Sequence, residues 1–313
     1  MKAMVINGFG KEVKLQSAKV PAPEMLNNDV LIEVFAASIN PLDLKIKNGL
    51  KGDFKLPLVM GNDFAGIVIK TSKAESRFRA GDKVYGRPSQ QRSGTFAEYI
   101  AVNEAEVAFM PINLDFDGAA SIPLVGLTSY QALCDVLKLK AGQKLLIHAG
   151  SGGVGTFAIQ LAKALGCYVA TTTSTANADW LKALGADEAI DYKQQKFNDV
   201  LHDYDAVFDT LGGQSLIDSF GILKNGGKIV SLIGLAGDDA EQRIGALQSQ
   251  YGVEYHYHHM QASGKQLADI TNYIEHGKIK PVIDRIFPIK KAQAAMEYLQ
   301  GGHAKGKIVL KIK

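Results

Sequence analysis

Residues 144–166 read KLLIHAGSGGVGTFAIQLAKALG, and this stretch decides the fold of the chain. An apolar run typical of a buried strand is followed by Gly150, Gly152 and Gly155 in the spacing G-x-G-x-x-G, and then by apolar residues at helical spacing. In a dinucleotide-binding turn the first glycine permits the tight turn, the second lets the backbone approach a pyrophosphate, and the third lets helix pack on strand. The stretch therefore predicts a strand, a turn and a helix whose N-terminus faces a phosphate.

The residues after this turn alternate between strand-like and helix-like segments. Further strands are expected at 168–173, 188–192, 204–209, 228–233 and 253–258, the last at the sheet edge, with helices at 176–184 and 215–223. Such alternation predicts an α/β fold with a doubly wound parallel sheet and helices on both faces.

The residues before 144 cannot be the first half of a dinucleotide fold, because such folds begin with the fingerprint strand. Short β-like runs at 3–6, 30–36, 65–69, 83–85 and 95–102 predict a small β barrel or sandwich, and 113–139 are expected to form a helical bridge. Residues 265–313, with expected helices at 265–275 and 290–299 and strands at 282–287 and 305–312, are expected to return and complete this domain. The predicted domains are 1–122, 123–264 and 265–313.

Composition excludes several classes of protein. Hydrophobic residues make up 46% of the 313 residues and charged residues 21%, as in globular proteins. A net charge of +3 without a long basic run argues against a nucleic-acid partner. No apolar run approaches ~18 residues and no signal peptide is visible, so we expect a cytoplasmic protein without a membrane partner. Cys134 and Cys167 are too few for a four-cysteine zinc lobe and are expected to be buried, reduced thiols.

Short motifs along nearly the whole chain resemble those of the medium-chain dehydrogenases/reductases, in particular their zinc-free quinone oxidoreductase branch. In chain order they are MKAMVI at 1–6, SINP at 38–41 with Asp43, PLVMGNDFAG at 57–66, GDKVYG at 81–86, GTFAEY at 94–99, IPLVGLTS at 122–129, HAGSGGVGTFAIQLAK at 148–163, LGAD at 184–187 with Asp191 and Tyr192, and GKIVL at 306–310. The resemblance implies a GroES-like β domain, an inserted Rossmann domain and an active-site cleft between them.

Zinc members of this superfamily carry a cysteine and a histidine at the positions matched here by Asn40 and Asn62. Asparagine is a poor zinc ligand, and a catalytic zinc needs about three protein ligands, so we expect no metal. His256, His258 and His259 are the other candidate ligands, with alternation placing His256 and His258 on one strand face. No carboxylate or cysteine follows at ligand spacing, which favours a polar edge strand or cleft lining over a metal site.

The strand after the glycine turn favours NADPH as the cofactor. No acidic residue lies between the start of this strand and Asp179, and an acid near a 2′-phosphate would cost roughly ten-fold or more in affinity. The family's usual basic residue is replaced here by Ala176 and Asn177, which leaves Ser174 and Thr175, with Tyr192 and Lys193, as the phosphate candidates. The alternative role of Ser174 is to cap the next helix.

The resemblance also implies where the nicotinamide lies. It places Thr128 and Asn40 near the ring and Ile233, Gly234, Gly306 and Lys307 along its ribose and amide side. Asn40 is the expected hydrogen-bond donor to the developing oxyanion, with turn formation before Pro41 as the alternative; Asp43 is a second catalytic candidate, with helix capping as its alternative. The predicted site thus comprises catalytic Asn40 and Asp43, and cofactor-binding Thr128, Gly150, Ser151, Gly152, Gly153, Val154, Gly155, Ser174, Thr175, Tyr192, Ile233, Gly234, Gly306 and Lys307.

The expected activity is zinc-independent, NADPH-dependent hydride transfer to a quinone or an α,β-unsaturated carbonyl compound. One alternative is an enoyl-thioester reductase, which needs a tyrosine donor near Asn40, whereas Tyr85 and Tyr99 are remote in sequence. Another is a dinucleotide-binding protein with vestigial catalysis. Loops 45–56 and 87–93 are expected to select the substrate, and the edge strand 253–258 is a possible homodimer contact.

Overall fold

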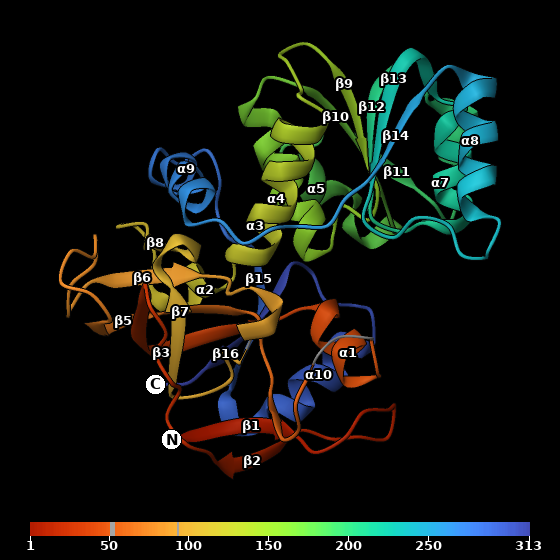
Figure 1. The fold of residues 1–313 in the computed structure, drawn as a ribbon. Helices are drawn as coiled ribbons and strands as arrows, with labels where there is room; N and C mark the ends of the chain where they lie inside the picture. Colours follow the sequence, from red (N-terminus) through yellow and green to blue (C-terminus); the bar gives the residue numbers. More distant parts are fainter. Residues whose placement is uncertain (51–53, 93) are drawn as a thin grey trace. The chain divides into compact units, whose positions relative to one another are not determined.

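The computed structural model describes residues 1–50, 54–92 and 94–313, and these form two compact units (Figure 1). The first unit comprises Met1–Leu127, Gln261–Gly277 and Pro281–Lys313, and the second comprises Thr128–Met260 and Lys278–Lys280. In sequence, the second unit is therefore an insertion within the first. Residues 51–53 and 93, which belong to the two loops expected to select the substrate, lie outside the described residues.

The second unit is built on a parallel sheet, as predicted. Residues 128–260 are all described, and six strands in them pair in the order β11-β10-β9-β12-β13-β14, with every pairing parallel. The strands are β9 (Lys144–Ile147), β10 (Tyr168–Thr173), β11 (Glu188–Asp191), β12 (Tyr204–Asp209), β13 (Leu223–Ser231) and β14 (Glu254–Tyr257). The predicted α/β fold class and the edge position of the last strand are confirmed.

Helices cover both faces of this sheet (Figure 1). Alternate residues of β9 enter opposite cores, because successive side chains of a strand point to opposite faces: Leu145 and Ile147 enter one core and Leu146 the other. The first core is closed by α4 (Gly153–Ala164) and α5 (Ala178–Leu184), and the second by α6 (Phe197–Val200), α7 (Gly213–Phe220) and α8 (Ala240–Tyr251).

Two predicted elements in or beside this unit differ from the structure, and one helix was not predicted. The expected helical bridge 113–139 is broken into α2 (Phe116–Ala120), α3 (Pro123–Tyr130) and a π-helical turn, Gln131–Val136. Pro123 has no backbone N–H to continue the preceding helix and instead begins a new one. The expected helix 215–223 ends at Phe220, because Leu223 already belongs to β13. Helix α8 was not expected, since among its residues only Ile244 is buried and no apolar stripe marks it.

The first unit is mainly β-structure. Over its described residues, one sheet has the strand order β15-β16-β3-β5-β6-β8 with β7 on β3, and a smaller sheet has the order β2-β1-β4. The strands are β1 (Lys2–Ile6), β2 (Gln16–Lys19), β3 (Asp29–Ile39), β4 (Leu58–Val59), β5 (Asp63–Thr71), β6 (Lys83–Gly86), β7 (Tyr99–Asn103), β8 (Val107–Phe109), β15 (Ile283–Pro288) and β16 (Lys307–Lys311), and the helices besides α2 are α1 (Pro41–Lys47), α9 (Gly264–Glu275) and α10 (Ala292–Gln300). The pairing of β16 with β3 places residues 307–311, near the end of the chain, in the same sheet as residues 29–39.

Strand predictions in the first unit fail where strands are short. β2, β4 and β8 have two to four residues each and were not expected, and the strand expected at 95–102 is shifted to Tyr99–Asn103. Strands of two to four residues are too short to show an alternation of apolar and polar residues in the sequence.

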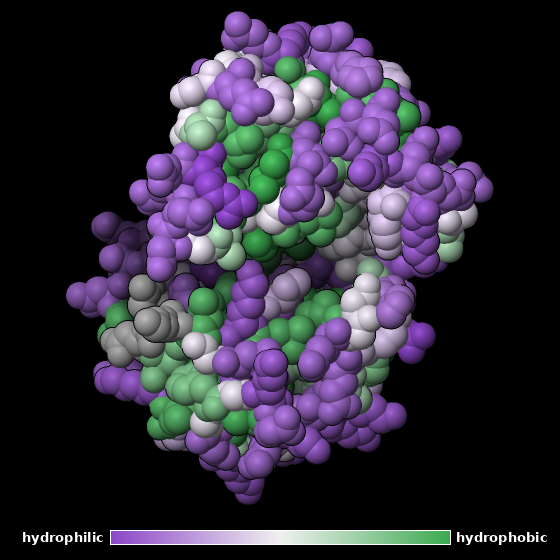
Figure 2. Space-filling model, turned by 90° about the vertical axis from the view of Figure 1, so that its right-hand side faces the viewer, coloured by the Kyte–Doolittle hydropathy of each residue, from purple (hydrophilic) through white to green (hydrophobic). Residues whose placement is uncertain are grey.

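Apolar side chains are largely held in these cores, and in the view of Figure 2 polar residues cover much of the surface while apolar ones gather in smaller patches. Cys167 is buried as expected, but Cys134 is only half-buried, and no disulfide joins the two in the described chain. Across residues 1–50, 54–92 and 94–313, we find no helix with the length and apolar character to traverse a bilayer.

Candidate functional site

The ends of neighbouring strands in the first unit bring polar side chains from distant parts of the sequence together. Across the sheet order β16-β3-β5-β6, Ile308 pairs with Ile39, Ser38 with Asp63, and Phe64 with Gly86. Because these pairings are antiparallel, the start of β16, the end of β3, the start of β5 and the end of β6 meet at one end of the sheet. We call the polar residues there the polar row: Lys307, Asn40, Asp43, Asn62, Asp63 and Arg87.

Asp63 is the most heavily hydrogen-bonded residue of the polar row. Its Oδ2 accepts from Ser38 Oγ at 2.7 Å and from Asn40 Nδ2 at 2.8 Å. The same oxygen lies 3.4 Å from the Lys307 ammonium, and Oδ1 accepts from the Leu124 backbone N–H at 2.8 Å. This fully buried carboxylate is therefore satisfied by hydrogen bonds and by a cation.

Asp43 is equally buried but has weaker partners. It is the third residue of α1, where its Oδ2 accepts from the backbone N–H of Asn40 at 2.7 Å, and its Oδ1 accepts from Asn62 Nδ2 at 2.7 Å. Both donors are neutral amides, so they do not offset the loss of hydration, and burial raises the pKa of Asp43 from 3.8 to about 7. The hydrogen bond from the Asn40 N–H is half of a capping box. Asp43 therefore caps α1, which was the alternative role expected for it.

This pKa leads to a prediction about stability. Between about pH 4 and pH 7 the folded protein keeps a proton on Asp43 that the unfolded chain has lost, so rising pH should lower stability across this window and change it no further above pH 7. Because asparagine does not titrate, wild type should lose up to ~1.4 kcal/mol per pH unit relative to Asp43→Asn in urea unfolding. The exposed Asp203→Asn is the control; if it shows the same slope as Asp43→Asn, Asp43 is not the source.

The side chain of Asn40 is fully engaged within the protein. Nδ2 donates to Asp63 and, at 3.5 Å, to the carbonyl of Ser38, while Oδ1 accepts from the Lys307 ammonium. Only 1% of the residue is exposed. The structure thus brings together the predicted residues Asn40, Asp43 and Lys307, but it uses the Asn40 amide to hold Asp63 and Lys307.

The donor set of the polar row does not fit a zinc ion. Where zinc members have cysteine and histidine, Asn40 Oδ1 is occupied by an ammonium and Asn62 Nδ2 faces Asp43. Burial lowers the pKa of Lys307 although Asp63 and Asp43 oppose that shift. Its Nζ also contacts the Ile39 carbonyl at 3.2 Å, so a cationic side chain stands among the oxygens that a metal would use.

Gly306, predicted with Lys307 to line the cofactor, has a separate structural role. Its φ is +86°, and an added Cβ would lie 2.3 Å from the Val282 carbonyl oxygen. A side chain is therefore excluded at this position by the turn that leads into β16.

In the second unit, the glycine turn connects β9 to α4 as predicted. An added Cβ at Gly150 would lie 2.1 Å from Thr171 Oγ1, and one at Gly155 would lie 2.5 Å from the Ala149 carbonyl oxygen. At Gly152 the nearest atom would be 3.5 Å away. Gly150 and Gly155 thus permit close packing, whereas a Cβ at Gly152 would make only an ordinary van der Waals contact; Gly152 precedes a twelve-residue helix whose N-terminal N–H groups can receive a diphosphate.

A buried histidine missed by the sequence analysis braces this turn. His148 Nδ1 lies 3.1 Å from Thr172 Oγ1 and Nε2 lies 2.9 Å from Ser219 Oγ. Burial lowers the pKa of His148 to about 4, so the ring is neutral and joins the ends of β9, β10 and α7 through hydrogen bonds. Thr172 Oγ1 also accepts from the Ala149 N–H at 3.1 Å, within the turn itself.

Another missed carboxylate fixes the loop that contains Ile233 and Gly234. Asp209, fully buried at the end of β12, accepts from the Gly212 N–H at 3.0 Å and from Ser231 Oγ at 2.5 Å. Ser231 Oγ in turn accepts from the N–H of Ile233 at 3.2 Å and of Gly234 at 2.9 Å. Ile233 is 42% exposed on this fixed loop, where it can contact a ligand.

The residues predicted to bind the 2′-phosphate lie at the ends of β10 and β11. Ser174 does not cap the following turn; its Oγ accepts from Asn177 Nδ2 at 3.2 Å. Thr175 donates its hydroxyl to Asp191, and this bond lowers the pKa of that carboxyl. Tyr192 is 63% exposed. Asp191 was missed as a partner because it is paired through the sheet register, Thr173 with Asp191, and not through sequence spacing.

The other predicted residues of this unit lie beside the turn. Ser151, Gly153 and Val154 are half-buried, and the Val154 carbonyl accepts from Ser129 Oγ at 3.4 Å. Thr128, on α3, is 4% exposed. These residues belong to the second unit, whereas Asn40, Asp43, Gly306 and Lys307 belong to the first.

Two pockets lie at opposite ends of the parallel sheet. One, of ≈ 350 Å³, is at the carboxyl ends of β10 and β11, where ligands of open α/β sheets bind; its lining includes Thr172, Tyr192, Asn198, Gln214 and Asp218. The buried Oδ1 of Asn198 has no partner within the described chain.

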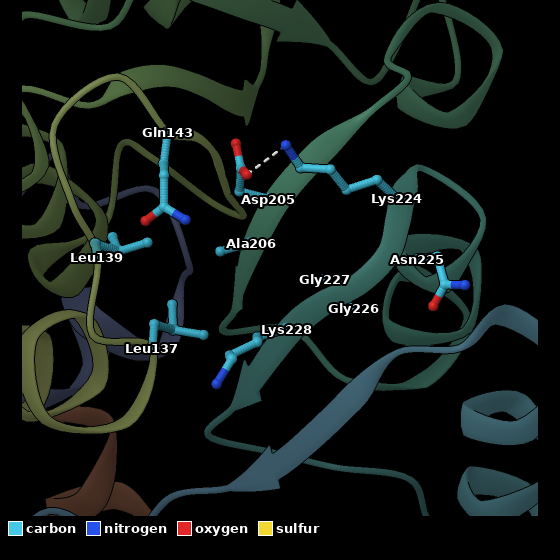
Figure 3. A pocket seen from close by; sticks show the side chains of 10 residues that line it. All are labelled: Leu137, Leu139, Gln143, Asp205, Ala206, Lys224, Asn225, Gly226, Gly227 and Lys228. Carbon is cyan, nitrogen blue, oxygen red and sulfur yellow. Dashed lines mark ion pairs between the residues drawn. The ribbon is translucent and has the colours of Figure 1, made fainter.

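The other pocket, of ≈ 80 Å³, lies at the opposite end of the sheet, beside the starts of β9 and β12 (Figure 3). Its lysines are already paired: Lys224 Nζ points to the Asp205 carboxylate at 2.5 Å, and Lys228 Nζ lies 3.0 Å from Glu254. We assign it no function, because both cations are neutralised and it faces away from the glycine turn.

The histidines at 256–259 are not aligned as the sequence analysis expected. β14 ends at Tyr257, so His258 lies beyond the strand that was expected to align it with His256. In the parts of the chain that the structure describes, no group of three or more His, Cys, Asp or Glu side chains could hold a metal ion.

A β unit interrupted in sequence by a parallel sheet with a glycine-rich first turn is the architecture of medium-chain dehydrogenases/reductases, and comparisons agree. Residues 26–112 match the alcohol dehydrogenase GroES-like domain family, and residues 184–310 match the zinc-binding dehydrogenase family. The chloroplastic NADPH-dependent alkenal/one oxidoreductase of Arabidopsis thaliana is 36% identical, over 99% of this chain and 79% of that protein.

Solved structures give the same result. The quinone oxidoreductase from Coxiella burnetii is 36% identical with a TM-score of 0.89, covering 100% of this chain and 99% of that one. The Escherichia coli quinone oxidoreductase complexed with NADPH is 26% identical with a TM-score of 0.88, covering 100% of both chains. The chain belongs to the medium-chain dehydrogenase/reductase superfamily, among its quinone and alkenal oxidoreductases, which confirms the family and fold that the motifs indicated.

Proposed function

We propose that this protein is an NADPH-dependent reductase that transfers a hydride to a quinone or an α,β-unsaturated carbonyl compound without a metal. The observation that carries the proposal is the glycine turn at the start of a long helix, where a Cβ at Gly152 would meet no atom closer than 3.5 Å, in a chain whose relatives are NADPH-dependent alkenal and quinone oxidoreductases. The ammonium of Lys307 among the polar-row oxygens supports the metal-free part.

In this proposal the second unit binds the diphosphate and adenosine parts of the cofactor. Residues 150–155 bind the diphosphate, the pocket beside Tyr192 takes the adenosine end, and Asn198 Oδ1 is a free acceptor for an amino group there. Ser174, Thr175 and Tyr192 are the proposed 2′-phosphate contacts, and Thr128, Ile233, Gly234, Gly306 and Lys307 the proposed nicotinamide contacts. NADPH supplies the hydride, and the chain supplies binding and orientation.

Asn40 and Asp43 are proposed to position other groups and not to touch the reacting atoms. Asn40 holds Asp63 and Lys307 in place, and Asp43 holds the start of α1 and the amide of Asn62. We further propose that the chain divides into domains at 1–122, 123–264 and 265–313, and that the protein is a cytoplasmic homodimer.

The activity is tested by mixing the protein with NADPH and a panel of quinones and alkenals and following NADPH oxidation by absorbance. Turnover with at least one member supports the proposal. Silence across the panel, despite tight NADPH binding, would instead support a dinucleotide-binding protein without catalysis.

Cofactor preference gives a separate prediction. We expect kcat/KM to be about ten-fold or more higher with NADPH than with NADH. Ser174→Asp should lower NADPH affinity by roughly ten-fold or more through charge repulsion and leave NADH binding unchanged. Ser249→Asp, on the exposed side of α8, adds the same charge away from the turn and should change neither affinity. Equal kcat/KM for both dinucleotides would refute the 2′-phosphate assignment.

A further inference from the structure

Arg87, at the β6 end of the polar row, is a buried cation with unmet hydrogen-bonding capacity. It is 6% exposed, and its Nε is buried without a hydrogen-bond partner in the described chain. Among residues 1–50, 54–92 and 94–313, no carboxylate lies within ion-pair distance of it. Arg92, in the same unit, shows the ordinary arrangement, with Nη1 and Nη2 each 2.7 Å from a different oxygen of Asp29.

The carboxylates near Arg87 are already engaged with other donors. Asp63 accepts from Ser38, Asn40 and Lys307, and Glu106 accepts from the Ser89 N–H at 3.0 Å. Burial therefore lowers the pKa of Arg87 despite the attraction of these groups. A buried charge that the protein itself does not compensate is costly, and such groups are retained mainly at functional sites.

A second unsatisfied atom lies on the neighbouring strand end. Asn62 is fully buried, its Nδ2 is used by Asp43, and its Oδ1 has no partner in the described chain. The pairing of Phe64 with Gly86 puts Asp63 across from Arg87, so Asn62 and Arg87 lie on adjacent strand ends. One unused donor and one unused acceptor are thus presented at the same end of the sheet.

We propose that Arg87 binds the carbonyl oxygen of the substrate and stabilises the negative charge that hydride transfer leaves on it. This inference rests on the proposed reductase function. It assigns to Arg87 the oxyanion contact that the sequence suggested for Asn40, whose amide protons are taken by Asp63 and Ser38.

The chemistry balances without a proton from Arg87. In an enone, the hydride and its electron pair form a C–H bond at the β-carbon, the C=C pair moves toward the carbonyl, and the carbonyl π pair becomes the charge on the enolate oxygen. Water then protonates the α-carbon. In a quinone, water protonates the enolate oxygen instead, and a proton then passes through water from the carbon that received the hydride to the second carbonyl oxygen, which gives the aromatic hydroquinone. The guanidinium gives up no proton in either reaction and acts only as a cationic hydrogen-bond donor.

The test compares Arg87→Met with Arg92→Met, which removes an arginine that has a structural partner. Because Arg87 lacks such a partner, Arg87→Met should leave the melting temperature unchanged or raise it, whereas Arg92→Met should lower it. With an enone that wild type reduces, Arg87→Met should lower kcat/KM about 100-fold and leave the Kd for NADPH unchanged. Arg87→Lys, which keeps the charge, should have a kcat/KM between those of wild type and Arg87→Met.

A binding measurement without cofactor or turnover isolates the contact. 4-Nitrophenol is a planar probe whose oxygen carries the negative charge when ionised, and its absorbance reports that ionisation. At one pH, near the pKa of the free probe, wild type should bind mainly the phenolate and Arg87→Met mainly the neutral phenol with about ten-fold lower affinity for the phenolate. Arg77→Met, which removes an arginine bound to the Glu104 carbonyl at 3.0 Å and outside both loops, should match wild type.

Equal ionisation and affinity of the probe in wild type and Arg87→Met would overturn the inference. So would destabilisation of Arg87→Met as large as that of Arg92→Met, since it would show a structural role. If wild type reduces no member of the quinone and alkenal panel, the proposed function fails, and the probe still decides separately whether Arg87 binds an oxygen anion.

Discussion

Lys307→Met is expected to lower the free energy of unfolding by about 3 to 5 kcal/mol, measured by urea denaturation at pH 7. The ammonium is 5% exposed, lies 3.4 Å from Asp63 Oδ2 and also contacts the Ile39 carbonyl. Methionine fills a similar volume but leaves a buried carboxylate without its cation. Removing one member of such a pair costs much more than the pair contributes, because the remaining charge stays desolvated.

Two further variants test whether the loss of stability is specific to the buried Lys307 or would follow the removal of any lysine on β16. Lys311→Met removes an ammonium whose side chain is 59% exposed and 3.9 Å from Asp117, and it should change stability by less than ~0.5 kcal/mol. Adding Asp63→Asn to Lys307→Met removes the unpaired charge and should recover part of the loss. A Lys307→Met protein as stable as the Lys311→Met protein would show that the buried pair does not stabilise the fold.

Gly152→Ala is expected to weaken NADPH binding without loss of stability, whereas Gly155→Ala is expected to lower the stability of the fold. At Gly152 an added Cβ meets nothing closer than 3.5 Å and φ is −77°, so alanine should fold without strain. The methyl group would stand at the helix N-terminus, where the proposal places the diphosphate, and NADPH affinity should fall roughly 100-fold. Calorimetric binding and thermal unfolding measure the two quantities on the same protein.

At Gly155 the added Cβ would lie 2.5 Å from the Ala149 carbonyl oxygen and 2.6 Å from the Gly150 Cα. Both are backbone atoms that cannot move without opening the turn, so we expect a loss of about 1 to 3 kcal/mol in stability. Gly245→Ala is the control, since an added Cβ there meets no atom within 4 Å; it should stabilise α8 by up to ~1 kcal/mol and leave NADPH binding unchanged. If Gly152→Ala instead binds NADPH like wild type, the diphosphate does not lie over this turn.

Much of the second unit could be predicted because its signals are local. The strand, glycine turn and helix at residues 144–166 are adjacent in sequence, and the buried strands of a parallel sheet read as continuous apolar runs. Helix α8 was not predicted because it lacks such a local signal. Ile244 is its buried residue, and a mostly exposed helix has no apolar stripe.

The polar row could not be predicted as a unit. Asn40 and Asn62 were noticed because the family's zinc ligands would stand there, but Asp63 and Arg87 are ordinary polar residues at strand ends. Asn40 and Lys307 are 267 positions apart, and only the pairing of β16 with β3 brings them together. Sequence spacing carries no information about which strand ends meet, so the partners of each side chain appear only in the folded sheet.

The position of β16 between β15 and β3 also determines when the protein can mature on the ribosome. Lys307 is added after every other member of the polar row and after the whole of residues 128–260. The second unit can therefore fold while the chain is still growing, whereas Asn40 and Asp63 leave the exit tunnel long before their cation exists. The first unit becomes complete only when residue 307 emerges, so a nascent chain stalled before that point should carry a finished Rossmann unit and an unfinished β unit.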